Sequence, residues 1–130
     1  MYSIAAEIVF NAGHYLVGPH GKQEQPHHHD WRVRATVESA QLDNCGLVMD
    51  FQMLQRLLRQ IVEPMKQAEF INNLTELAAG DDTNINPSTE RIARYIYDGL
   101  ARQLPGRVHL TEVLVWETPD NRAAYRPTRD

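Results

Sequence analysis

The sequence predicts an α+β domain in which an antiparallel four-stranded sheet carries two helices on one face. Three observations predict this class. In the first two segments of the chain, apolar and polar residues alternate. Two amphipathic segments with helical spacing follow, and two β-forming runs come last. The predicted order is strand, strand, helix, helix, strand, strand, within a single domain spanning residues 1–130.

The first strand is predicted over residues 2–14, where residues of core type recur with the two-residue period of a strand. Ile4, Ile8 and Phe10 share one face, and His14 stands at the far end of that face. A loop rich in glycine, proline and polar residues follows, and "HHHDWRVRATVE" then repeats the alternation. Because only about a dozen residues separate the two strands, we expect them to pair as an antiparallel hairpin.

Three consecutive histidines open the second strand. His27 and His29 lie on the same face as Trp31. His28 points to the other face. In an antiparallel hairpin the end of the first strand lies beside the start of the second, so His14 comes near His27 and His29. The alternation therefore predicts three imidazoles at one rim of the apolar face.

Two helices are predicted between the strand pairs. In "LVMDFQMLQRLLRQIVEPM" the apolar residues have helical spacing, with Asp50 as the N-cap and Pro64 near the end. In "NPSTERIARYIYDGLARQLPG", Pro87 suits the first helical turn and Pro105-Gly106 ends the helix. The last two strands are predicted in "RVHLTEVLVWET" and, as a shorter strand, in "AAYRP".

Composition limits the classes of function. The chain has 130 residues and 42% hydrophobic content, which is enough for one modest core. A net charge of −4 without any basic block argues against a nucleic-acid binder. The sequence shows no signal-like N-terminus and no apolar run of membrane-spanning length, so we expect a cytoplasmic protein with no membrane partner.

Three histidines on one rim predict a metal site. His-x-His on a strand places two imidazoles about 7 Å apart on one face, and a third from the neighbouring strand completes a triangle. Zinc accepts three histidine nitrogens and keeps a fourth position for water or substrate, which is typical of catalytic sites. Nickel or iron tolerates the same ligands, so the identity of the metal stays open. His20 and His109 are interpreted as a loop residue and a strand residue outside the cluster.

Five motifs occur in order from Phe10 to Tyr125: "FNAGHYL", "HHHDW", "GLVMDF", "NPSTER" and, before that tyrosine, "VLVWET". Together they resemble the 6-pyruvoyltetrahydropterin synthase family, which includes the bacterial 6-carboxytetrahydropterin synthases of queuosine biosynthesis. "HHHDW" occupies the position at which the family has His-Gly-His-Asn-Tyr. The resemblance covers nearly the whole chain. Any one motif would be weak, but five in order at suitable spacing are specific.

The resemblance implies a tunnelling fold, in which subunits join their sheets into a trimeric barrel and two trimers stack as a homo-hexamer. Ring closure removes the two open edges of a four-stranded sheet. The resemblance also implies Zn²⁺ on His14, His27 and His29, the triad that alternation predicts, and a small-molecule pterin as substrate. In the family a glutamate near the C-terminus grips the guanidine-like edge of the pterin, and Glu117 in "WET" matches it.

The resemblance bears on the start of the second helix as well. Ser88 stands where the family usually has threonine before its conserved glutamate, here Glu90, and is a candidate substrate-binding residue. Either side chain suits a helix cap instead, and this is the interpretation that we favour for Glu90.

The sequence departs from the family at two places. The family's catalytic cysteine lies a few residues before His-x-His, but residues 21–26 contain no cysteine. Cys45, the single cysteine, follows the far end of the second strand and is expected to be a small buried apolar residue. Gln67 and Ala68 stand where the family's Leu-Asp-His-x-x-Leu-Asn has aspartate and histidine, whereas Asn72 matches its last position.

Glu24 offers a replacement for the cysteine. Its Glu-x-x-His-x-His motif resembles a subgroup of the family that carries glutamate there and cleaves the dihydroneopterin side chain to 6-hydroxymethyl-dihydropterin. We therefore predict a zinc-dependent pterin-processing lyase with Glu24 as the catalytic base. Two alternatives stay open: a catalytically inactive pterin- or purine-binding paralogue, and a metal-dependent lyase or hydrolase without a side-chain base. Loops 17–26 and 66–86 are expected to line the pocket.

Overall fold

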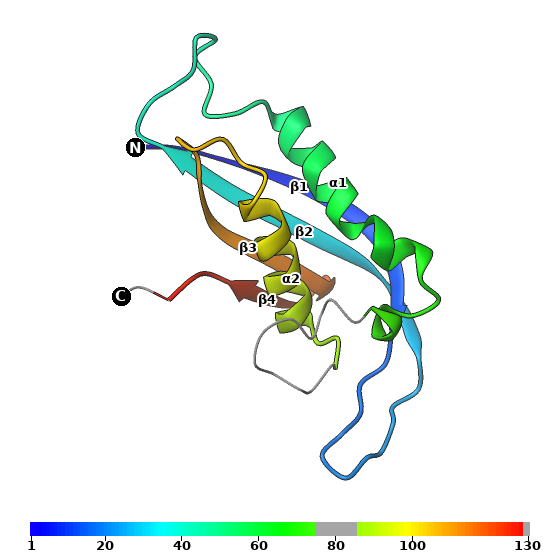
Figure 1. Cartoon of the computed structure of the whole chain (residues 1–130). Helices are drawn as coiled ribbons and strands as arrows, with labels where there is room; N and C mark the ends of the chain where they lie inside the picture. The colour runs from blue at the N-terminus through cyan, green and yellow to red at the C-terminus, as the bar shows by residue number, and fades with distance from the viewer. Residues whose placement is uncertain (75–85, 129–130) are drawn as a thin grey trace.

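The computed structural model describes residues 1–74 and 86–128. Its elements in chain order are β1 (Tyr2–His14), β2 (His27–Ser39), α1 (Phe51–Gln67), the short 3₁₀ helix η1 (Ile71–Asn73), α2 (Thr89–Ala101), β3 (His109–Thr118) and β4 (Asn121–Tyr125). The strands form one antiparallel sheet in the order β1-β2-β3-β4. Both α-helices lie on the same side of this sheet (Figure 1). The predicted α+β class and element order are confirmed, and residues 75–85 of the predicted pocket loop 66–86 lie outside the described residues.

The hairpin of β1 and β2 is paired along its whole length. Each strand has 13 residues, and the register runs from Tyr2 opposite Ser39 to His14 opposite His27 without a shift. Ala12 is opposite His29, which keeps both on the side of the sheet that the helices cover. The antiparallel pairing expected from the short connection is confirmed.

The core lies between the sheet and the two helices. Val33, Ala35 and Val37 of β2 are 0% exposed, as alternation toward the covered face requires. The helices contribute apolar residues at helical spacing, fully excluded from solvent: Leu54 and Leu58 from α1, and Ile92, Ile96 and Leu100 from α2. Burial of these residues fixes which face of each strand is covered, and so fixes the direction of every other side chain on the strand.

The helix ends agree with the predicted signals, with two adjustments. The carboxylate of Asp50 accepts a hydrogen bond from Gln52 N at 2.7 Å, as an N-cap should. Helix α1 continues past Pro64 to Gln67, so this proline lies inside the last turn. Pro87 precedes the N-cap of α2 and does not stand in its first turn, because Ser88 has an extended backbone and begins the helix.

The C-terminal strands start at different residues from those predicted. β3 begins at His109, two residues later than expected, after a backbone turn in which Val108 N donates to Pro105 O. β4 begins at Asn121, earlier than the "AAYRP" run, because Pro119 and Asp120 make a tight turn and pairing resumes at once. Strand β4 therefore extends the sheet by only five residues.

Cys45 is exposed and free, so its predicted burial is wrong. It lies in the turn after β2, where the Asp43 carboxylate accepts hydrogen bonds from Cys45 N and Leu47 N. Gly46 in this turn has a φ of +80°, a conformation that suits glycine. These backbone hydrogen bonds lower the pKa of Asp43, and the turn projects away from the core.

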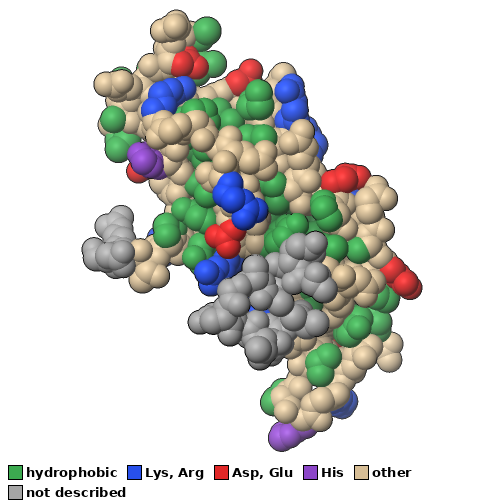
Figure 2. Space-filling model, viewed as in Figure 1, with side chains coloured by type: hydrophobic (Ala, Val, Ile, Leu, Met, Phe, Trp, Pro, Cys, Tyr) green, Lys and Arg blue, Asp and Glu red, His purple; other side chains and the backbone are tan. Residues whose placement is uncertain are grey.

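The face that carries the helices shows charged side chains of both signs, scattered among apolar ones (Figure 2). Neither helix in residues 1–74 and 86–128 combines the length and the apolar character that crossing a bilayer requires. Within one chain the sheet is open, with β1 and β4 as its edges, and its closure into a barrel stays a prediction.

Candidate metal centre

The hairpin register brings the three predicted histidines together. His14 and His27 are directly opposite each other, and their Nε2 atoms lie 2.8 Å apart. The ring centroids of His27 and His29 are 4.6 Å apart, and those of His14 and His29 are 5.7 Å apart. Together with a carboxylate oxygen of Glu117, the ligand atoms of this cluster all lie within 4.8 Å of one another. The predicted juxtaposition of the three imidazoles is present in the structure.

Glu117 contributes the fourth member of the cluster from β3. Its Oε1 lies 3.2 Å from His14 Nε2, 3.5 Å from His27 Nε2 and 3.0 Å from His29 Nε2. The sequence predicted Glu117 as a pterin-binding residue, but gave no sign that it contacts all three imidazoles. That position depends on the pairing of β2 with β3, in which Arg32 is opposite Trp116.

Backbone carbonyls orient two of the imidazoles. His14 Nδ1 lies 2.8 Å from Pro87 O, and His27 Nδ1 lies 3.0 Å from Gln25 O. A carbonyl only accepts, so we assign the ring proton to Nδ1 in both residues, which leaves the Nε2 lone pairs directed into the cluster. Backbone support of this kind fixes ring direction at metal sites.

The donor set fits a metal ion. Two Nε2 lone pairs that face each other at 2.8 Å repel unless a proton or a cation lies between them. His29 Nε2 is a buried nitrogen without a hydrogen-bond partner among the described residues, although Glu117 Oε1 is 3.0 Å away. Three imidazoles and one carboxylate are the ligands that zinc accepts. The cluster could therefore hold a divalent cation.

The electrostatics of the cluster favour the protonation states that metal ligands need. Burial lowers the pKa of His29, which outweighs the opposite effect of the Glu117 charge. Burial by itself raises the pKa of Glu117, but the hydrogen bond from Thr89 and the neighbouring His14 and His29 outweigh it, so this pKa lies below its ordinary value. A neutral imidazole and an ionised carboxylate at neutral pH are the forms that bind a cation.

Trp31 forms the floor of the cluster. Its side chain is 0% exposed, and its Nε1–H donates to Ala12 O at 3.0 Å. The rings of His14 and His29 meet it edge to face, with centroids 4.9 Å and 5.5 Å away. Because a fully packed indole cannot shift, it restricts both imidazoles to one orientation.

Glu24 lies at the open side of the cluster. One of its oxygens, Oε1, accepts a hydrogen bond from Leu16 N at 2.8 Å and is 4.0 Å from His27 Nε2. The side chain is 43% exposed, so it is in contact with solvent as well as with the cluster. The structure therefore places Glu24 near the three histidines but outside the tight group that includes Glu117.

The start of α2 contains a residue that the sequence reasoning missed. Thr89 Oγ1 donates to Glu117 Oε2 at 3.0 Å, so Thr89 holds the second carboxylate oxygen. The neighbouring Ser88 caps the helix, because its Oγ accepts from Arg91 N. Glu90 stands exposed in the first turn. The adjacent Ser-Thr pair was the available signal, since one hydroxyl caps the helix and leaves the other for a different partner.

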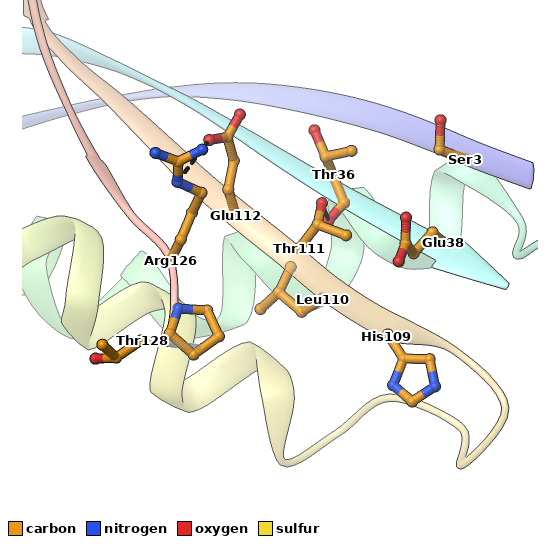
Figure 3. A pocket seen from close by; sticks show the side chains of 10 residues that line it. Ser3, Thr36, Glu38, His109, Leu110, Thr111, Glu112, Arg126 and Thr128 are labelled. Carbon is orange, nitrogen blue, oxygen red and sulfur yellow. Dashed lines mark hydrogen bonds and ion pairs between the residues drawn. The ribbon is translucent and has the colours of Figure 1, made fainter. Parts of the chain in front are cut away.

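The remaining histidines lie outside the cluster, as interpreted from the sequence. His28 is on the opposite face, where its ring covers Gly13 so closely that a Cβ atom there would lie 2.7 Å from His28 Nε2. His20 is exposed in the loop between β1 and β2. His109 lines a separate pocket at the start of β3, and the Glu112–Arg126 ion pair lies at the other end of this pocket (Figure 3).

The positions of the missing aspartate–histidine pair contribute nothing to the cluster. Gln67 Nε2 donates to Glu63 Oε1 at 2.7 Å on the surface of α1, and Ala68 is the C-cap residue. Asn72, the matching asparagine, bonds the backbone of Tyr15.

The sequence model of one family, described as 6-pyruvoyl tetrahydropterin synthase, matches residues 3–128. The chain belongs to this family. A 6-carboxy-5,6,7,8-tetrahydropterin synthase of Bacillus subtilis is 26% identical over 132 residues, covering 98% of this chain and 87% of that protein. A dihydroneopterin monophosphate aldolase of Pyrococcus furiosus is 30% identical over 94 residues, covering 72% of each chain.

A solved structure has the same fold. It is a Plasmodium vivax 6-pyruvoyltetrahydropterin synthase in which a catalytic glutamate is replaced by alanine. The TM-score is 0.73 at 18% identity, over 98% of both chains. Membership of the family and the pterin synthase and aldolase relatives support a pterin-acting enzyme.

Proposed function

We propose that this protein is a zinc-dependent pterin lyase of aldolase type, which cleaves the dihydroneopterin side chain to release 6-hydroxymethyl-dihydropterin. One observation carries the proposal. The Glu24 carboxylate, bound by a backbone N–H, lies 4.0 Å from an imidazole of a three-histidine cluster, a spacing that would let a base and a metal act on neighbouring atoms of one substrate.

His14, His27 and His29 are the residues that would hold the metal through Nε2. Zinc, when bound there, supplies a Lewis acid that polarises the side-chain oxygens of the substrate. Pro87 O and Gln25 O keep His14 and His27 protonated at Nδ1, so that the Nε2 atom of each ring would be available to the metal.

Glu24 is proposed to accept the proton of the side-chain hydroxyl on the carbon beyond the scissile bond. That oxygen becomes a carbonyl as the carbon–carbon bond breaks, and the bonding pair of electrons moves into the pterin ring. Return of a proton to the carbon that stays on the ring gives the hydroxymethyl group, and the two-carbon aldehyde leaves. The hydrogen bond from Leu16 N holds Oε1, the oxygen 4.0 Å from His27 Nε2, and leaves the carboxylate further lone pairs to take the proton.

Glu117 and Ser88 are proposed to bind the substrate. A carboxylate suits the guanidine-like edge of a pterin, because two parallel N–H groups can donate to its two oxygens. Thr89 fixes one of these oxygens in place. The Ser88 hydroxyl accepts from Arg91 N and keeps its own O–H, which is the donor proposed to bind the ligand.

The relatives support this choice of reaction. One protein of the family named above is a dihydroneopterin monophosphate aldolase, and another uses a glutamate as a catalytic residue. Both properties belong to those proteins, and they make a glutamate-dependent aldolase a consistent proposal for a chain that has no cysteine at residues 21–26.

The proposed assembly is a homo-hexamer formed by two trimeric barrels, since it would pair the free edges of β1 and β4. Light scattering on the purified protein should give a mass of about six times the 14.9 kDa chain. A monomer at micromolar concentration would contradict this assembly.

The test of the reaction uses zinc-loaded protein with dihydroneopterin, its monophosphate and its triphosphate. We expect release of 6-hydroxymethyl-dihydropterin from at least one of them, and loss of about 10²–10⁴-fold in turnover with Glu24→Gln, the range for removal of a general base. Glu63→Gln is the matched control, because Glu63 is an exposed carboxylate on α1, outside both predicted pocket loops. Equal turnover by Glu24→Gln and wild type would exclude Glu24 as the base.

The inactive pterin- or purine-binding paralogue is the second candidate. It is favoured by Gln67 and Ala68, which occupy the positions of the family's aspartate and histidine without reaching the cluster. It predicts that calorimetry detects pterin binding, that Glu117→Gln abolishes it, and that no product forms from any of the three substrates.

A further inference from the structure

The segment that follows β1 has its backbone bonded on both sides by groups from elsewhere in the chain. On one side, Asn72 of η1 makes two hydrogen bonds with Tyr15: Tyr15 N donates to Asn72 Oδ1 at 3.1 Å, and Asn72 Nδ2 donates to Tyr15 O at 2.8 Å. An amide side chain has the same donor and acceptor as a peptide group, so Asn72 pairs with Tyr15 as a neighbouring strand would.

Asn86 repeats this arrangement two residues further on. Val17 N donates to Asn86 Oδ1 at 2.9 Å, and Asn86 Nδ2 donates to Val17 O at 2.8 Å. In an extended segment, alternate residues direct their N–H and C=O to the same side. Asn72 and Asn86 therefore supply two successive steps of a ladder on one side of residues 15–17.

The opposite side of this segment carries the candidate base. Leu16 N donates to Glu24 Oε1 at 2.8 Å, and Glu24 N donates to Leu16 O at 2.9 Å. The residue before the segment is His14, whose ring is held by Pro87 O, next to Asn86 in sequence. One short stretch of backbone thus links two asparagine amides to a candidate metal ligand and to the candidate base.

The location of the segment explains why it needs such support. Residues 15–17 lie beyond β1, where pairing is reduced to the isolated bridge between Val17 and Gln23 and the chain leaves the sheet for the loop that extends from its end (Figure 1). Helix η1 lies against this end of β1. Without the two amides, the N–H and C=O groups of Tyr15 and Val17 would have only solvent as partner, and the segment would be held on one side only, by the bonds between Leu16 and Glu24.

We propose that Asn72 and Asn86 are positioning residues, which fix residues 15–17 so that His14 and Glu24 stand at the correct distance from His27. This inference rests on the proposed function, because it concerns the metal ligand and the base assigned there. It makes a distinct prediction, since the hydrogen bonds that carry it join the two asparagines to the backbone of Tyr15 and Val17.

The experiment compares Co²⁺ binding by the wild type, Asn72→Ala, Asn86→Ala and the double variant, with competition titrations followed by absorbance. We expect each single variant to bind Co²⁺ about 10–100-fold more weakly, the range for groups that orient metal ligands. Asn73→Ala is the matched control, because Asn73 is an exposed neighbour in the same 3₁₀ helix. It should bind Co²⁺ like the wild type.

Amide hydrogen exchange of the metal-free protein gives a readout that does not depend on metal or turnover. The Leu16 amide should be protected in the wild type and in Asn73→Ala, and should exchange at least about tenfold faster in the Asn72 and Asn86 variants. If Leu16 exchange rises while Co²⁺ affinity stays the same, the two asparagines are only structural and the inference is overturned.

Failure of the proposed function looks different. A wild type with a protected Leu16 amide that binds no Co²⁺ would remove the metal site, and the positioning role with it, while leaving the hydrogen bonds intact. If the alanine variants do not fold, Asn72→Asp serves the same test: it keeps the acceptor for Tyr15 N and loses the donor to Tyr15 O. Unchanged Co²⁺ affinity in that variant would also overturn the inference.

Discussion

On β2, His27, His29 and Trp31 face the helices, whereas His28 and Arg32 face away from them. The covered side ends in a cluster whose Nε2 and carboxylate atoms lie within 4.8 Å of one another. On the open side, three guanidinium groups surround the other tryptophan: the Cζ atoms of Arg32, Arg34 and Arg122 lie 4.1, 5.1 and 5.6 Å from the ring centroid of Trp116.

Each side has a tryptophan with charged or titratable side chains around it, but the packing differs. On the covered side the rings are packed against each other and their polar atoms have fixed partners, so their directions are set. On the open side, long charged side chains meet one indole and one carboxylate, Glu7, which bonds Arg34 at 2.6 Å. His27 and His29 are candidate ligands and His28 is not, because only their face of the strand brings a histidine to His14 and Glu117.

The largest effect is expected when the cluster loses a ligand. His29→Ala should abolish stoichiometric metal binding, because three imidazoles become two and Glu117 loses the partner at 3.0 Å. His28→Ala is the matched control on the opposite face and should keep the metal. Elemental analysis of both variants after gel filtration measures the difference. Equal loss of metal from both would show that the covered face of β2 is not what distinguishes the ligands.

The next effect concerns the two tryptophans. Trp31→Ala should lower the free energy of unfolding by about 3–5 kcal/mol, because a fully buried indole leaves a cavity. It also leaves Ala12 O without its donor. Trp116→Ala should cost less, since the arginines that cover it can rearrange. Urea denaturation of both variants gives the two values, and similar losses would mean that the open face is packed as rigidly as the core.

A smaller effect is expected from pH in the metal-free protein. Burial keeps the pKa of His29 below its ordinary value of 6.5, and the pKa of Glu117 lies below its ordinary value of 4.5, because Thr89 and the histidines outweigh burial. In both cases the unfolded state binds more protons as the pH falls, so acidification lowers the free energy of unfolding. The contribution of His29 is lost as the pH falls below 6.5, and that of Glu117 as it falls below 4.5.

Urea denaturation in EDTA, from pH about 8 down to about 3, measures this loss. His29→Gln should reduce the change in the free energy of unfolding near pH about 6. Glu117→Gln should reduce the change at more acidic pH. Curves for both variants that run parallel to the wild type would show that these two groups do not couple folding to pH.

The smallest effect is expected on the open face. Arg122→Ala should lower the free energy of unfolding by about 0.5–1 kcal/mol, the range for an exposed cation–π contact. Its metal content should equal that of the wild type, because Arg122 lies on the face opposite to the cluster. Loss of metal in this variant would show that the two faces are coupled.

Much of this molecule follows from short-range pattern. Alternation in residues 2–14 and 27–39 predicts both strands, their covered faces and the meeting of His14 with His27 and His29, because side chains on a strand repeat every two residues. Asp50 marks the start of α1 for an equally local reason, since its carboxylate bonds a backbone N–H two residues away.

The tertiary structure alone decided the contacts between segments that are distant in the chain. Glu117 reaches the imidazoles through the pairing of β3 with β2, Thr89 reaches Glu117 across 28 positions, and Asn72 reaches Tyr15 across 57. Cys45 is a different case: it is exposed in a turn that Asp43 organises through bonds two and four residues away, a local signal that the prediction of burial overlooked. A sequence period determines which way a side chain points, but what it meets there depends on how separate elements pack.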